Sequence, residues 1–167
     1  MTDGGLRWEL EHNLRRCTEA AAILSEDLAA HPEVSGREYR SSRKIVDVFR
    51  EGGLEVEHPF PEMAAVFRAA KEGGAAAKVA LLVEYDALPD LGHGCGHSLH
   101  GAMSVLAGLA LAPLMKRLDG ALVLFGTPAE ECDGAKVPLA ADGIFDDVDL
   151  ALMIHCNGGS SSSPSAP

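Results

Sequence analysis

Short apolar runs alternate with helical patterns in the second half of the chain. Near-continuous apolar runs at residues 78–85, 121–125 and 150–155 are typical of strands that are buried on both faces. Helical patterns at about 98–117 and 135–142 separate these runs. Because strands that alternate with helices form a sheet covered on both sides, this order predicts an α/β fold, a three-layer αβα arrangement with a mainly parallel sheet.

The first half of the chain is predicted to add two helices and two strands. Apolar residues recur at helical spacing over 6–30, and a second helix spans about 38–51, before the Gly52-Gly53 pair. The segments 54–60 and 64–70 have the composition of strands. We therefore expect strands from both halves of the chain in the fold.

The composition is that of one globular domain and excludes several classes of partner. The chain has 167 residues, of which 47% are hydrophobic, and a formal net charge of −11. An acidic chain is not attracted to nucleic acid or to an anionic membrane surface. The longest apolar run, 103–114, contains a proline and is too short to span a bilayer. With a polar start and no CxxC pair among four cysteines, the chain is expected to be cytoplasmic and its thiols reduced.

Polar side chains gather where the three buried strands end. Glu84, Asp86 and the loop "LGHGCGHSLHG" follow the first strand, Glu130 and Glu131 follow the second, and the third ends at His155. The carboxyl ends of parallel strands meet at one edge of a sheet, where ligands bind. Thiolates and imidazoles are good zinc ligands, and of two adjacent carboxylates one can hold an ion while the other acts as general base. The sequence therefore predicts a metal site at this edge.

Several of these residues also have an ordinary structural explanation. His93 is typical of a loop histidine, and His100 of a packed or hydrogen-bonding residue near the site. Cys132 and Cys156 are expected to be small buried residues. Cys95 lies between glycines, which is unusual for a structural cysteine, and a thiol nucleophile paired with a nearby histidine is an alternative to a metal ligand.

The motifs resemble a known family. "EYDALPDLGHGCGHSLHG", "GTPAEE" and "MIHC", with "HPEVSGREYRSS" nearer the start, are similar to the amidohydrolase branch of the metallopeptidase-20 family. That branch includes aminobenzoyl-glutamate hydrolases, aminoacylase-like and carboxypeptidase-like enzymes, and dipeptidases. The resemblance runs from about Leu6 to Asn157 and implies a zinc-peptidase-like catalytic domain.

The resemblance also implies roles for six residues. Glu130 would be the general base, and Asp86 would orient a metal ligand. The cofactor would be a divalent metal, zinc or else manganese or cobalt, with two ions in full-length members of the family. The metal ligands would be Cys95 in the bridging position, His97, Glu131 and His155.

The implied reaction is hydrolysis of an amide bond of an N-acyl amino acid or a dipeptide by metal-activated water. Family members are often homodimers and continue into a smaller dimerisation and lid domain, followed by a last histidine ligand. Here residues 1–156 would form the N-terminal part of the catalytic domain and 157–167 a flexible Gly/Ser/Pro tail, so the fold is expected to be C-terminally truncated. An alternative is an inactive remnant, or half of a split enzyme that binds metal or a partner chain without catalysis.

Overall fold

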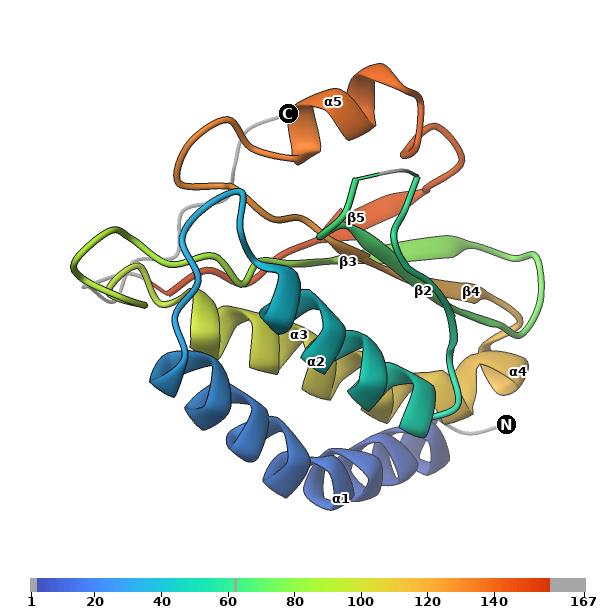
Figure 1. The fold of residues 1–167 in the computed structure, drawn as a ribbon. Coiled ribbons are helices and arrows are strands. Elements are labelled where there is room, and N and C mark those ends of the chain that lie inside the picture. Colours follow the sequence, from blue (N-terminus) through green and yellow to red (C-terminus); the bar gives the residue numbers. More distant parts are fainter. Residues whose placement is uncertain (1–2, 62, 157–167) are drawn as a thin grey trace.

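The computed structural model describes residues 3–61 and 63–156, and it has the α/β fold that the alternating pattern predicts (Figure 1). The predicted tail, 157–167, lies outside the described residues. One sheet has the strand order β1-β2-β4-β3-β5. Its strands are β1 (Glu55–Glu57), β2 (Phe67–Glu72), β3 (Lys78–Val83), β4 (Ala121–Gly126) and β5 (Leu150–Leu152).

The sheet is mixed, with its parallel part on the side of the predicted site. Strand β3 lies between β4 and β5 and pairs in parallel with both. Strand β2 pairs antiparallel with β4 and with β1, so β2 is the reversed strand among the five described. Strand β1 is shorter than its predicted segment because Pro59 and Pro61 follow it and lack the N–H that a ladder needs.

Helices cover both faces of the sheet and complete the three layers (Figure 1). On one side α2 (Tyr39–Glu51) and α3 (His97–Leu111) lie against the sheet, and α1 (Asp3–Ala30) packs on α3. The other face is covered by α5 (Lys136–Ala141). The single helix predicted at 98–117 is divided. A 3₁₀ turn at Ala112–Leu114, which contains Pro113, separates α3 from α4 (Met115–Leu118).

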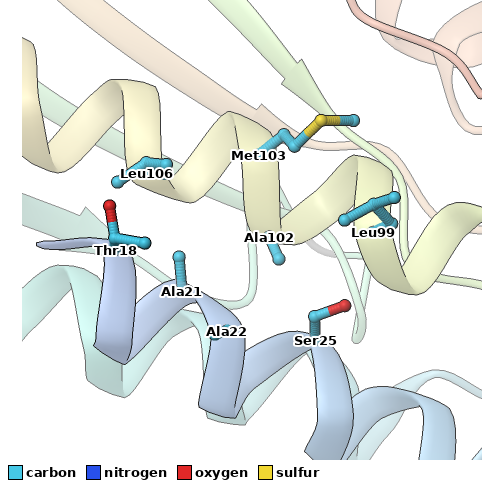
Figure 2. Close-up of a pocket in the computed structure, with 8 residues that line it drawn as sticks. All are labelled: Thr18, Ala21, Ala22, Ser25, Leu99, Ala102, Met103 and Leu106. Atoms are coloured by element: carbon cyan, nitrogen blue, oxygen red, sulfur yellow. The ribbon is translucent and has the colours of Figure 1, made fainter. Parts of the chain in front are cut away.

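Helix α3 is the central helix of its layer. Small side chains of α1 face larger ones of α3 along the seam between the two helices. An apolar hollow remains there, lined by Thr18, Ala21, Ala22, Ser25, Leu99, Ala102, Met103 and Leu106 (Figure 2). The stretch His97–Leu118 is the one helical segment in the described part of the chain that is long and apolar enough to cross a membrane. Most of that stretch is buried inside the fold, as in the core helix of a globular domain.

Strand β5 differs from the prediction of a buried strand over 150–155. It has three residues, all exposed, and among the described strands it pairs with β3 alone. The side chains of Leu150 and Leu152 are each 50% exposed, and that of Ile154 is 57% exposed. An apolar run predicts burial only where a neighbouring strand and a covering helix exist, and β5 lies at the edge of the described sheet.

Candidate metal and catalytic site

The predicted site residues come together at the carboxyl ends of the parallel strands. Chain segments that continue from β3, β4 and β5 deliver Asp86, Glu131 and His155 respectively. The loop before α3 adds Cys95, and the first residue of the helix is His97. The side chains that the strand order predicted to meet at one edge of the sheet therefore do lie together there.

A glycine makes the entry into α3 possible. Gly96 is the N-cap residue and has φ of 90°, in the left-handed region that favours glycine. A Cβ atom at this position would lie 2.8 Å from Cβ of Cys156. The tight turn thus brings the loop against the segment that follows β5 and sets His97 beside it.

His97 is the centre of the site. Its ring is fully buried, and Nδ1 lies 2.6 Å from Oδ1 of Asp86. Its Nε2 faces three other candidate ligands, at 3.1 Å from Nε2 of His155, 3.2 Å from Oε2 of Glu84 and 3.7 Å from Oε1 of Glu131. Although burial opposes a charge on the ring, the hydrogen bonds to Asp86 and Glu84 raise the pKa of His97 to about 10.

Asp86 organises its surroundings through both carboxylate oxygens. Oδ1 fixes the His97 ring, and Oδ2 accepts hydrogen bonds from Oγ of Ser35 at 2.6 Å and from the backbone N–H of Glu131 at 2.9 Å. Burial opposes ionisation, but these hydrogen bonds prevail and lower the pKa of Asp86. An ionised carboxylate that holds one histidine nitrogen leaves the other nitrogen free for a metal.

Two groups of three side chains could hold a metal ion. One is Glu84, His97 and His155, and the other is Cys95, His97 and Glu131. The ligand atoms within each group lie within 4.8 Å of one another. The mixture of sulfur, nitrogen and oxygen donors suits zinc and accepts other divalent transition metals, so the residues present fit the predicted metal.

Glu130 is held beside these groups with one free oxygen. Its Oε2 lies 2.8 Å from Nζ of Lys136, while Oε1 is buried and has no hydrogen-bond partner among the described residues. The preceding residue, Ala129, has φ of 64°, and its N–H donates to the buried carboxylate of Glu38 at 2.7 Å. The backbone turn that presents Glu130 is therefore fixed by the residue that directly precedes α2.

Sequence reasoning assigned no role to three residues that lie at the site. Glu84 lies two residues before Asp86, a spacing that puts both side chains on one side of an extended segment, and this was the available signal. Lys136 and Glu38 carried no comparable signal, because they reach the site from α5 and from the segment before α2.

The residues with ordinary explanations behave in different ways. His100 is fully buried and its Nδ1 lies 2.8 Å from Oε2 of Glu84, whereas His93 belongs to neither metal group. Cys132 is exposed, contrary to the prediction, because it lies in the turn that follows β4 rather than in the core. Burial raises the pKa of Cys95, which does not favour the free thiolate that a nucleophile needs.

Solved structures of known proteins share this fold. The Bacillus subtilis YXEP protein, described as a dinuclear metal binding peptidase from the M20 family, superposes with a TM-score of 0.75 at 23% identity. The match covers 88% of this chain and 44% of that one. An aminobenzoyl-glutamate utilization protein from Klebsiella pneumoniae superposes with a TM-score of 0.67 at 24% identity, over 87% of this chain and 46% of that one.

Curated relatives are similar in sequence over most of this chain. The Xaa-Arg dipeptidase of Mus musculus is 31% identical over 168 residues, which cover 90% of this chain and 38% of the dipeptidase. A p-aminobenzoyl-glutamate hydrolase chain of Escherichia coli (strain K12) is 29% identical, over 79% of this chain and 31% of the hydrolase chain. The present chain thus spans roughly a third of the length of these relatives.

The part of the chain that contains the candidate site is also the part that identifies its family. The sequence model of peptidase family M20/M25/M40 matches residues 80–166, which is more than half of the chain. That range contains all six residues to which the motifs assign a role. The chain belongs to peptidase family M20/M25/M40.

Proposed function

We propose that this chain carries the greater part of the catalytic site of a metal-dependent hydrolase, with residues 1–156 as part of its catalytic domain. The substrate would be an N-acyl amino acid or a dipeptide, the two classes suggested by relatives named dipeptidase and p-aminobenzoyl-glutamate hydrolase. The observation that carries the proposal is the position of His97, whose Nε2 faces carboxylate and imidazole ligands while Asp86 holds its other nitrogen.

The roles of the protein side chains follow from their contacts. Cys95, His97, Glu131 and His155 would hold the metal. A bound divalent ion, zinc or else manganese or cobalt, would polarise the scissile carbonyl and make water more acidic. Asp86 keeps the His97 ring in one tautomer and also fixes the backbone of Glu131.

Glu130 would be the general base, and its contacts support that role. Its unpaired oxygen would accept a proton from the attacking water as the oxygen of that water bonds to the carbonyl carbon. The same proton would pass to the amine nitrogen as the C–N bond breaks. Lys136 holds the second oxygen of Glu130 and restricts the rotation of its carboxylate.

Metal content and hydrolysis of the purified chain test this proposal. We expect about one divalent ion or more per folded chain, lost in the Cys95→Ala/His97→Ala double variant. The Glu130→Gln variant should keep the metal and lose hydrolysis of N-acyl amino acids and dipeptides. A folded chain without metal would contradict the proposal, and loss of metal in Glu130→Gln would reverse the roles of Glu130 and Glu131. Metal without hydrolysis in the unaltered chain would favour the alternative of a non-catalytic remnant or one half of a two-chain enzyme.

A further inference from the structure

We propose that Glu84 is a metal ligand, and that with His97 and His155 it forms a three-ligand site that needs neither Cys95 nor Glu131. This inference rests on the proposed function and extends it, since the family motifs assign no role to Glu84. It predicts that the chain can bind one metal ion through oxygen and nitrogen donors alone.

The spacing of the three donor atoms matches a tetrahedral metal. Ligand atoms about 2.0 to 2.2 Å from a zinc ion lie roughly 3.3 to 3.6 Å apart in a tetrahedron. Here Nε2 of His97 lies 3.1 Å from Nε2 of His155 and 3.2 Å from Oε2 of Glu84, and His155 Nε2 lies 3.8 Å from that oxygen. The three atoms therefore form one face of such a tetrahedron with little rearrangement.

The Glu84 carboxylate is also held in place by Lys136 and His100. Lys136 forms a salt bridge to Oε1, so the other oxygen, Oε2, is the one directed at the imidazoles. His100 orients that same oxygen through Nδ1, at 2.8 Å. A carboxylate fixed by two partners keeps its position when an ion arrives, which favours tight binding.

Burial argues against a purely structural ion pair. The Glu84 side chain is 4% exposed, and that of His97 is 1% exposed. A buried carboxylate costs free energy unless positive charge surrounds it, and in the metal-free chain Lys136 and the His97 ring supply that charge. When His97 gives up its proton to bind an ion, the divalent charge replaces that of the ring beside Glu84. His155 is the accessible member of the group, because its side chain is 41% exposed. An ion would enter the site from solvent past this residue.

His97 belongs to both candidate groups, so the two can be separated by experiment. Cobalt(II) bound by a thiolate has a strong charge-transfer band in the near ultraviolet, whereas cobalt bound by nitrogen and oxygen has only weak visible bands. A Cys95→Ser/Glu131→Gln variant removes two ligands of one group and leaves Glu84, His97 and His155 intact. Cobalt titration of this variant therefore reports on the Glu84 group alone, without any assay of hydrolysis.

We expect the double variant to bind about one cobalt ion per chain, with visible bands and no charge-transfer band. Adding Glu84→Gln should weaken this binding by more than about 100-fold, because even residues that only orient ligands contribute about 10- to 100-fold. Glu55→Gln is the matched control, since Glu55 is exposed on β1, at the opposite edge of the sheet from β5. Circular dichroism and thermal unfolding of each variant verify that it is folded.

Each other outcome overturns the inference. If the unaltered chain binds cobalt with a charge-transfer band but the folded double variant binds none, Glu84 is no ligand and the proposed function stands. If the double variant binds cobalt and Glu84→Gln leaves the affinity unchanged, the ligand is a different residue. If the unaltered folded chain binds no cobalt and no zinc, this inference and the proposed function both fail.

Discussion

At the scale of single residues, His97 has a carboxylate against each ring nitrogen. Asp86 lies at Nδ1 and Glu84 at Nε2, so the metal-free ring is stabilised as an imidazolium. With its pKa raised from 6.5 to about 10, this stabilisation is fully present below about pH 6.5 and is lost as the pH rises through 10. The metal-free chain should therefore lose stability from this residue over that interval.

Metal binding should accordingly release a proton from His97. We expect the apparent zinc affinity to rise with pH by about tenfold per unit for each proton displaced, between about pH 6 and 8. Titrations at several pH values, with calorimetry in buffers of different ionisation enthalpy, would count the protons. An affinity that is independent of pH would show that His97 does not bind the ion.

Glu38 offers a test of how the backbone presents Glu130. Its buried carboxylate accepts hydrogen bonds from the N–H groups of Gly36 and Ala129. Glu38→Ala would leave both donors unsatisfied and should lower the free energy of unfolding by about 2 to 4 kcal/mol. Glu38→Gln retains an acceptor oxygen, and because burial already raises the pKa of Glu38, this neutral variant should cost less than about 1.5 kcal/mol. Urea unfolding measures both values, and equal losses in the two variants would contradict the assignment.

At the scale of elements, the close packing of α3 against the end of β3 determines where His97 lies relative to the residues that follow the strand. A Cβ atom on Gly101 would lie 2.7 Å from the backbone oxygen of Glu84, so Gly101→Ala must push the helix away from the strand end. We expect a loss of about 1 to 3 kcal/mol in unfolding free energy and weaker metal binding, because His97 is on the same helix. Gly94→Ala is the control, since a Cβ there meets only ordinary contacts at 3.5 Å or more. Unchanged metal binding in folded Gly101→Ala would show that the site tolerates movement of α3.

A bidentate ion pair connects α1 to α2. The two terminal guanidinium nitrogens of Arg40, Nη1 and Nη2, each lie 2.9 Å from one carboxylate oxygen of Asp27, and this hydrogen bonding lowers the pKa of Asp27. The pair therefore stabilises the fold above the ordinary pKa of 3.8 and ceases to do so as the pH falls through the lowered value. Asp27→Asn should cost about 0.5 to 1 kcal/mol near neutral pH, and the cost should shrink as the pH falls through the lowered pKa of Asp27. Thermal unfolding over a series of acidic pH values checks this, and a cost that does not shrink in acid would mean that packing, not charge, is responsible.

The sequence predicts the buried elements better than the edge ones. Strands β3 and β4 are recognisable because burial on both faces requires a continuous apolar run. Strand β5 has an equally apolar sequence, yet its exposure depends on which chain segments lie beside it, and a local pattern holds no such information.

The same distinction applies to the site. Asp86, Cys95 and His155 were predictable because they lie at strand ends or in a loop between glycines. The contact between Lys136 and Glu84 was not, since it joins residues 52 positions apart through the placement of α5 on the opposite face of the sheet. The contact between Lys136 and Glu84 can be recognised only after α5 has been placed on the sheet.

At the scale of the whole molecule, the outer edge of β5 is an open surface. Leu150, Leu152 and Ile154 share one side of the segment and are each at least half exposed, and no strand in the described part of the chain pairs with the outer edge of β5. The chain by itself should therefore self-associate at high concentration. Leu152→Lys should reduce the weight-average mass measured by sedimentation equilibrium toward that of a monomer. Ile23→Lys, at a similarly exposed position on α1, should not, and an equal effect of both would point to net charge as the cause.

The position of His155 has a kinetic consequence. It follows a strand that, among the described residues, is held by three residue pairs with β3 alone. Glu84, in contrast, follows β3, which is paired on both sides, and Cys95 and His97 lie at the start of the buried helix α3. Transient detachment of the β5 edge would remove one ligand while the core stays intact. The residence time of a bound ion would then be governed by the opening rate of this one edge, so a chain that pairs with β5 would slow metal loss without touching the ion.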